Sequence, residues 1–121
     1  MAGMLRLGST VLGASDVRRA VEFWGRALGY VPRDGVADGT FVVLTSPDGA
    51  SENISVMLSE TPVQEKPRVH LDLYTAEPAR EIERLLALGA SHVDWQDYPP
   101  DADFTVLADT EGNRFCVIDK A

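Results

Sequence analysis

The sequence predicts an α+β fold built from two successive copies of one strand–helix–strand–strand–strand unit. Two amphipathic helical segments each follow a short alternating strand, and they end in the nearly identical stretches RALG (26–29) and LALG (86–89). After each helix comes a matching hairpin, FVVLTSPDG at 41–49 and FTVLADTEG at 104–112. Similarity at a fixed spacing of about 60 residues is typical of an internally repeated architecture.

Short apolar strands open and close each copy. STVLG at 9–13 and RVHLDLY at 68–74 are the expected first strands, and both alternate in the way of a half-buried strand. ISVML at 54–58 and RFCVI at 114–118 are the expected last strands. In RFCVI, side chains alternate between the two faces of the sheet, so Cys116 shares its face with the residues two positions before and after it.

Each predicted helix carries its own end signals. Ser15 or Asp16 can cap the first helix, and Gly29 suits the left-handed residue that ends it. For the second helix, Thr75 is the expected cap and Gly89 the expected end. Both helices have an apolar face, formed by Val17, Ala20, Val21, Trp24 and Leu28 in the first and by Ile82, Leu85 and Leu86 in the second. Trp24 is therefore expected in the core.

A chain of 121 residues is long enough for one domain with a substantial core. We expect a single domain over 1–121, with module one at about 5–60 and module two at about 68–119. The segment TPVQEKP at 61–67 is the predicted linker between them.

Composition limits the possible partners and location. The formal charge of −8 and pI near 4.6 argue against nucleic-acid and anionic-membrane partners, because both require a basic surface. The same charge favours a cationic ligand. The single cysteine cannot form an internal disulfide, and the N-terminal apolar run is too interrupted for a membrane span. A cytoplasmic location is the resulting expectation.

The duplicated unit, the LG that ends each helix and the DTEGN turn at 109–113 resemble the vicinal oxygen chelate superfamily. That superfamily includes glyoxalase I, bleomycin-resistance proteins and extradiol dioxygenases. The stretch from His70 to Ile118 looks especially like its small glyoxalase-like domain proteins. Over roughly residues 5–119, the resemblance implies a half-open eight-stranded barrel around a pocket, with the helices outside. It is specific for fold and not for activity.

The resemblance also implies metal-ligand positions, a histidine that begins each copy's first strand and a carboxylate in each last strand. His70 keeps its position, whereas Ser9, Met57 and Cys116 stand at or near the other three. Hydroxyl and thioether groups are weak donors, and a thiol binds metal only as the thiolate. We therefore expect a degenerate site, no cofactor and purification without stoichiometric metal. An off-pattern site of His70, Asp72 and Cys116 stays open, since residues 70 and 72 share a strand face.

The ligand-lining residues that the resemblance implies differ between the two copies. An indole such as Trp95 can stack on a flat or cationic ligand. Cys116 can either pack as a small hydrophobic residue or act as a nucleophile beside a base. The expected ligand-binding residues are Ser9, Val11, Ser55 and Met57 in module one and His70, Tyr74, Trp95 and Cys116 in module two.

Three classes of function are consistent with the sequence. The first is a metal-independent protein that binds a small aromatic or cationic molecule. The alternative is a lyase, isomerase or hydrolase with His70, Asp72 and Cys116 as catalytic residues, acting with or without an off-pattern metal. A domain retained for association alone is the third. We expect a homodimer, because an open sheet edge invites a partner strand.

Overall fold

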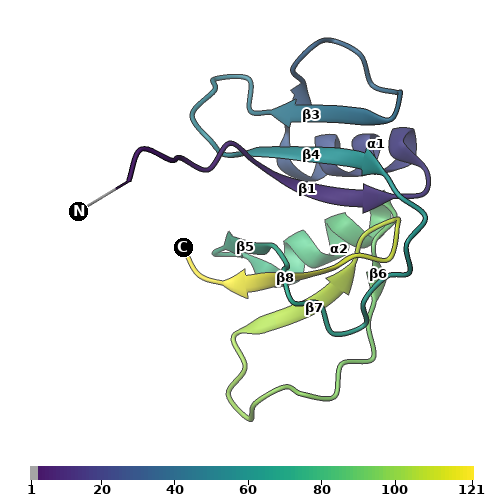
Figure 1. Ribbon diagram of the computed structural model, residues 1–121. Coiled ribbons are helices and arrows are strands. Elements are labelled where there is room, and N and C mark those ends of the chain that lie inside the picture. Colours follow the sequence, from purple (N-terminus) through teal and green to yellow (C-terminus); the bar gives the residue numbers. More distant parts are fainter. Residues whose placement is uncertain (1–2) are drawn as a thin grey trace. The chain divides into compact units, whose positions relative to one another are not determined.

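The computed structural model describes residues 3–121, and the chain divides into two compact units, one as far as Glu60 and the other from Thr61. Each unit has the order strand–helix–strand–strand–strand (Figure 1). Each sheet has four strands and neither closes on itself within the described residues. The predicted α+β class and the tandem βαβββ repeat are therefore confirmed.

The first unit is one mixed sheet with a helix against it. Its strands follow the order β1-β4-β3-β2, in which β1 runs parallel to β4 and the other neighbours are antiparallel. The helix contacts the sheet mainly through β3 and β4. The elements are β1 (Ser9–Ala14), α1 (Val17–Leu28), β2 (Val31–Pro32), β3 (Phe41–Thr45) and β4 (Asn53–Leu58).

Helix α1 begins and ends where the sequence predicts. Asp16 is the N-cap residue, and its Oδ1 accepts a hydrogen bond from the backbone N–H of Arg19 at 3.0 Å. Gly29 ends the helix with φ 71°, a left-handed conformation in which glycine has no steric penalty. Trp24, only 1 % exposed, lies edge-on to Phe23 with ring centroids 5.1 Å apart, so its expected place in the core is confirmed.

The second unit repeats this arrangement with the strand order β5-β8-β7-β6. Strand β5 runs parallel to β8, and β7 is antiparallel to both of its neighbours. Helix α2 contacts the sheet mainly at β8. The elements are β5 (Asp72–Thr75), α2 (Pro78–Leu88), β6 (Ser91–His92), β7 (Phe104–Ala108) and β8 (Arg114–Asp119).

Two expectations for the start of this unit are wrong. The first strand begins at Asp72 and not at residue 68. The pairing of Asp72 with Cys116, extended backwards, would set residues 68 and 69 opposite residues 112 and 113, and those belong to a turn and offer no strand partner. Thr75 is not the helix cap, because Glu77 holds the N-cap position. The Thr75 hydroxyl instead accepts a hydrogen bond from the backbone N–H of Glu77 at 3.0 Å.

A buried carboxylate organises the turn before β8. Asp109 is 3 % exposed, and its Oδ1 accepts hydrogen bonds from the backbone N–H groups of Glu111 and Asn113, both at 2.9 Å. Gly112 follows with φ 89°, which favours glycine. The turn thereby fixes the start of β8, the strand that carries Cys116.

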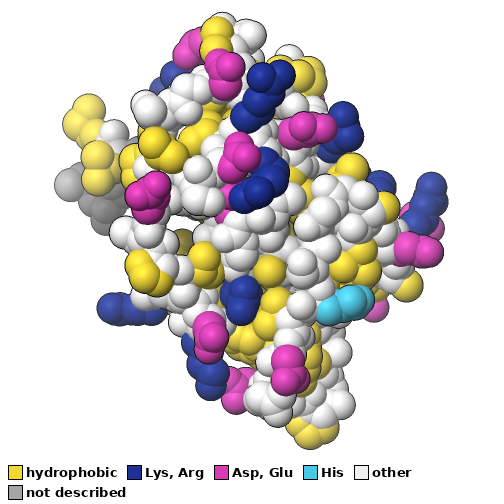
Figure 2. Space-filling view, turned by 90° about the vertical axis from the view of Figure 1, so that its right-hand side faces the viewer, with side chains coloured by type: hydrophobic (Ala, Val, Ile, Leu, Met, Phe, Trp, Pro, Cys, Tyr) yellow, Lys and Arg dark blue, Asp and Glu magenta, His cyan; other side chains and the backbone are white. Residues whose placement is uncertain are grey.

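The surface mixes charges of both signs. Figure 2 shows acidic and basic side chains interspersed over the face that it presents. Within residues 3–121, neither helix combines the length and apolar character needed to cross a bilayer.

Candidate functional site

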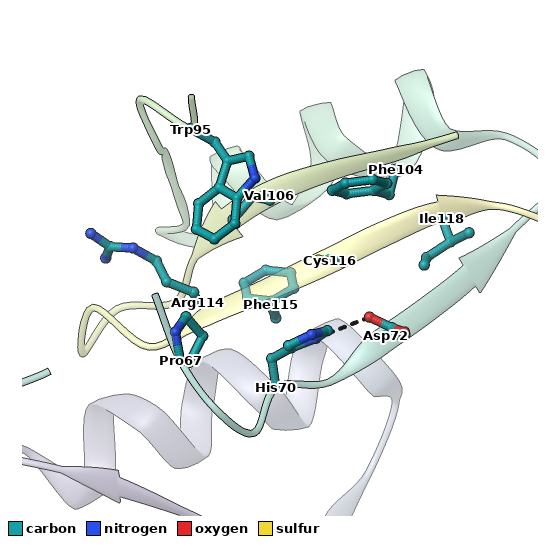
Figure 3. A pocket seen from close by; sticks show the side chains of 10 residues that line it. All are labelled: Pro67, His70, Asp72, Trp95, Phe104, Val106, Arg114, Phe115, Cys116 and Ile118. Carbon is teal, nitrogen blue, oxygen red and sulfur yellow. Dashed lines mark ion pairs between the residues drawn. The ribbon is translucent and has the colours of Figure 1, made fainter. Parts of the chain in front are cut away.

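A pocket of about 320 Å³ opens on the sheet of the second unit (Figure 3). Its floor follows from strand pairing: Asp72, Cys116 and Val106 are aligned across β5, β8 and β7, and Phe104 and Ile118 pair beside them. Val117, which alternates with Cys116 and Ile118, belongs to the other face and is 2 % exposed. The lining consists of Pro67, His70, Asp72, Trp95, Phe104, Val106, Arg114, Phe115, Cys116 and Ile118.

Three chemically different side chains meet at one side of this pocket. His70 Nδ1 lies 3.1 Å from Asp72 Oδ1, with the two side chains 40 % and 42 % exposed. Cys116 is paired with Asp72 across β5 and β8 and is 9 % exposed. One ligand atom from each of the three residues lies within 4.8 Å of the other two. An N–H that Nδ1 donates to Asp72 would leave Nε2 as a hydrogen-bond acceptor.

The cysteine is held in its neutral form. Burial, followed by the charge of Asp72 and a hydrogen bond to it, raises the pKa of the Cys116 thiol from 9.0 to about 11. Because the thiolate is the nucleophile, a thiol with this pKa is unreactive near neutral pH. This favours the interpretation in which Cys116 packs in the pocket wall.

Aromatic side chains form the opposite side of the pocket. In Figure 3, Trp95 and Phe104 stand across the strands from His70 and Asp72. Tyr98 supports this side: its ring lies 5.3 Å from that of Phe104, and its hydroxyl accepts a hydrogen bond from the backbone N–H of Val106 at 2.8 Å. The loop after β6 therefore brings the indole of Trp95 to the pocket.

Arg114 lies at the edge of the pocket. Its Nη1 donates to the carbonyl oxygen of Gly112 at 2.8 Å. Its Nε is buried and makes no hydrogen bond within residues 3–121.

The structure brings together four of the predicted site residues, which are His70, Asp72, Trp95 and Cys116. Tyr74 shares their sheet face through its pairing with Ile118, but it does not line this pocket. It is 60 % exposed, with Lys120 Nζ 5.1 Å from its ring centroid.

The four predicted residues of the first unit lie on one face of their own sheet. Pairing of Val11 with Ser55 and of Gly13 with Met57 aligns that face. Ser9 Oγ lies 2.6 Å from Ser55 Oγ, and the Ser55 side chain is fully buried. Their contribution to ligand binding stays a prediction.

Sequence reasoning missed six lining residues, namely Pro67, Phe104, Val106, Arg114, Phe115 and Ile118. The alternation that placed Cys116 on one face also places Arg114 and Ile118 there. The same alternation applied to residues 104–108 would have predicted that Phe104 and Val106 lie on one face of the sheet. Pro67 carried no such signal, because it stood in the predicted linker.

The residues at the inherited ligand positions do not fit a hard divalent ion. The Ser9 hydroxyl is already engaged with Ser55 at 2.6 Å, and Met57 offers only a thioether. Neither supplies the charged or imidazole donor that such sites use.

The sequence from residue 9 to residue 118 matches the family model of the glyoxalase-like domain. This chain belongs to the glyoxalase-like domain family. None of the curated proteins matches its sequence.

Solved structures with low sequence identity share the fold. A glyoxalase-related enzyme from Fulvimarina pelagi is 18 % identical, with a TM-score of 0.69, over 95 % of this chain and 88 % of that one. A fosfomycin resistance protein from Listeria monocytogenes, in complex with Mn(II) and 1S,2S-dihydroxypropylphosphonic acid, is 13 % identical with a TM-score of 0.70, over 99 % and 93 %. A bleomycin-binding protein from Streptomyces verticillus, in complex with copper(II)-bleomycin, is 18 % identical with a TM-score of 0.60, over the full length of both chains.

Proposed function

We propose that this protein binds a small, flat aromatic molecule in the pocket of its second unit. The observation that carries the proposal is the pairing of an aromatic side, Trp95 and Phe104, with a polar side, His70 and Asp72, around about 320 Å³. A largely apolar cavity with a few convergent polar groups is the usual form of a small-molecule site.

In this proposal the pocket recognises the aromatic ring of the ligand and not a positive charge on it. Trp95 and Phe104 offer faces for stacking, and Ile118 and Val106 add apolar surface. His70 and Arg114 supply hydrogen bonds that orient polar substituents. Because Arg114 lies in the same lining as Asp72, the pocket does not have the uniformly acidic lining that would select a cation.

The test is ligand titration in the presence of EDTA, with indole, benzamidine and benzoate as neutral, cationic and anionic aromatic probes. A Trp24→Phe background isolates the fluorescence of Trp95, since these are the two tryptophans of the chain. We expect saturable quenching, with indole bound at least as tightly as benzamidine. Trp95→Ala should weaken binding roughly tenfold, as measured by calorimetry, because aromatic stacking contributes about 0.5–1.5 kcal/mol beyond burial.

His92→Ala is the matched control, since His92 is exposed on β6 and outside this lining. It should bind the probes as the parent does. Non-saturable quenching, or calorimetric binding that survives Trp95→Ala unchanged, would contradict the proposal. Tighter binding of benzamidine than of indole would assign recognition to charge instead.

The second candidate is an enzyme, a lyase, isomerase or hydrolase, in which His70 is the base and Asp72 orients it. The 3.1 Å contact between these side chains favours it. The raised pKa of Cys116 argues against a nucleophilic role for the thiol. A bound probe recovered unchanged after prolonged incubation supports binding, whereas its conversion, lost in His70→Ala, would support catalysis.

A cytoplasmic location accompanies the proposal. It depends on the single cysteine, which cannot form a disulfide within the chain.

A further inference from the structure

The sheet face that carries the pocket continues into a second cavity of about 640 Å³, which lies entirely within the second unit. Strand register builds its floor, because Arg114 on β8 pairs with Ala108 on β7, and Ala108 pairs with Ser91 on β6. All three residues line this cavity. Ser91 and Ala108 have small side chains, so this row of the sheet leaves open space beside the guanidinium.

Two residues, Trp95 and Arg114, line both cavities. Arg114 precedes Cys116 by two positions on β8, so both side chains lie on one face of the sheet, about 6.6–6.8 Å apart along the strand. In Figure 3 the guanidinium of Arg114 points away from His70 and Asp72. The two cavities are therefore neighbours, and a ligand in the first can reach the second beside the Trp95 indole.

Arg114 is a cation without a carboxylate partner. Its Nη1 donates to the carbonyl oxygen of Gly112, and the guanidinium makes no other hydrogen bond or ion pair within residues 3–121. Its Nε is buried, whereas the unbonded Nη2 is not. The lysine in the same lining differs, because Lys66 Nζ lies 2.9 Å from Asp97 Oδ2. A guanidinium binds carboxylates well, since its charge strengthens each hydrogen bond.

The acidic side chains of the second cavity leave this guanidinium unpaired. Asp109 accepts its hydrogen bonds within its own turn, and Asp94 Oδ1 accepts one from Gln96 Nε2 at 2.6 Å. Glu65 is exposed, where salt screens its charge beyond about 8–10 Å. The formal charge of −8 opposes an anion at long range, so direct contact with Arg114 must supply any selectivity for one.

We infer that the ligand is an aromatic acid, with its ring on Trp95 and Phe104 and its carboxylate, on a short arm, bound by Arg114 in the second cavity. The inference rests on the proposed function and adds the chemical class of the ligand. The arm is required because the guanidinium points away from the first pocket. Asp72 repels a carboxylate at the other side of that pocket, so one orientation of the ligand is favoured.

The experiment is a calorimetric titration of the full chain, in EDTA, with probes that share the indole ring. Indole carries no charge, indole-3-propionate carries a carboxylate on an arm, and tryptamine carries an ammonium group on an arm. We expect indole-3-propionate to bind about tenfold more tightly than indole, because it adds a charge-assisted hydrogen bond. Tryptamine should bind no more tightly than indole. Indole-2-carboxylate, which has no arm, should bind more weakly than indole-3-propionate.

Substitutions test the assignment to Arg114. In Arg114→Gln the preference for indole-3-propionate over indole should disappear, and Arg114→Lys should restore part of it, because lysine keeps the charge without the planar fork. Arg80→Gln is the matched control. It removes one positive charge from α2, outside both linings, and should leave the preference unchanged.

Equal affinities for indole and indole-3-propionate, with saturable binding of both, would overturn this inference and leave the proposed function intact. Absence of saturable binding by either probe would overturn both. A preference that survives Arg114→Gln, or tighter binding of tryptamine than of indole-3-propionate, would also overturn the inference. The probes are compared in the wild-type protein, so the test stands even if Arg114→Gln, which loses the contact with Gly112, fails to fold.

Discussion

Asp109 and Asn113 close the last hairpin of the second unit through both the backbone and the side chain. Asp109 Oδ1 lies 2.9 Å from the Asn113 backbone nitrogen, and its Oδ2 lies 3.1 Å from Nδ2 of the same residue. In the corresponding turn of the first unit Ser46 stands at the position of Asp109, and its Oγ accepts a hydrogen bond from the backbone N–H of Ser51 at 3.2 Å. Asp48, two residues further on, is exposed, and its Oδ1 accepts a hydrogen bond from the backbone N–H of Ala50 at 3.0 Å, so it serves as an exposed turn carboxylate for comparison.

We expect Asp109→Ala to reduce the free energy of unfolding by roughly 2–4 kcal/mol, because it removes a charged acceptor from donors that become buried and unsatisfied. Denaturant unfolding followed by circular dichroism measures the change. Asp48→Ala should show a far smaller loss. Equal losses in the two variants would contradict the assigned role of the Asp109 carboxylate.

His70→Ala should weaken binding of the aromatic probe about tenfold and shift the melting temperature by only a few degrees. The His70–Asp72 pair is about 40 % exposed, and exposed ion pairs contribute about 0–1 kcal/mol to stability. Calorimetric titration and thermal unfolding measure the two quantities, with His92→Ala as the control. A large drop in melting temperature with binding retained would identify His70 as structural.

The raised pKa of Cys116 predicts a specific dependence on pH. The folded-state pKa of about 11 lies above the ordinary value of 9.0, so the folded protein holds the proton more tightly than the unfolded chain. The contribution of the raised Cys116 pKa to the free energy of unfolding is fully present below about pH 9, and it is lost as the pH rises to about 11. The unfolding free energy of the wild type should therefore approach that of Cys116→Ala over this range.

Thiol chemistry gives an independent check on Cys116. Iodoacetamide should alkylate the folded protein slowly near neutral pH and faster as the pH approaches 11, because only the thiolate reacts. The urea-unfolded chain should react readily near pH 9. Rapid alkylation of the folded protein at neutral pH would contradict the raised pKa.

We expect a homodimer. The sheet orders leave β1 and β5 at sheet ends, each paired on one side only within its own sheet, and such edges favour pairing with another strand. Light scattering at micromolar concentration should give twice the chain mass of 13.2 kDa. A measured mass equal to that of one chain would contradict the homodimer.

Repetition made most of the fold predictable. RALG and LALG mark both helix ends because each supplies a glycine for the left-handed residue, and both glycines have positive φ. Asp16 was one of two suggested caps, and its side chain makes the capping bond. These are local effects, which the chain encodes within a few residues.

The predictions were wrong where residues distant in the sequence determine the local structure. The strand before α2 is shorter than its alternation suggests, because the turn around Asp109 removes its partner. Thr75 has the right side chain for a cap, yet the helix begins beyond it. Of the site, His70 and Cys116 followed from the family pattern, and alternation along the strands could have added Phe104 and Arg114, whereas Pro67 lies outside any strand and carried no such signal.

Every residue that lines the pocket comes from the stretch between Pro67 and Ile118, so one copy of the repeated unit supplies the whole cavity. The two copies of the unit are therefore unequal in their chemistry. The residues predicted for the sheet face of the first unit, Ser9, Val11, Ser55 and Met57, include no ionisable side chain, whereas the second unit supplies His70, Asp72 and Arg114 to its pocket.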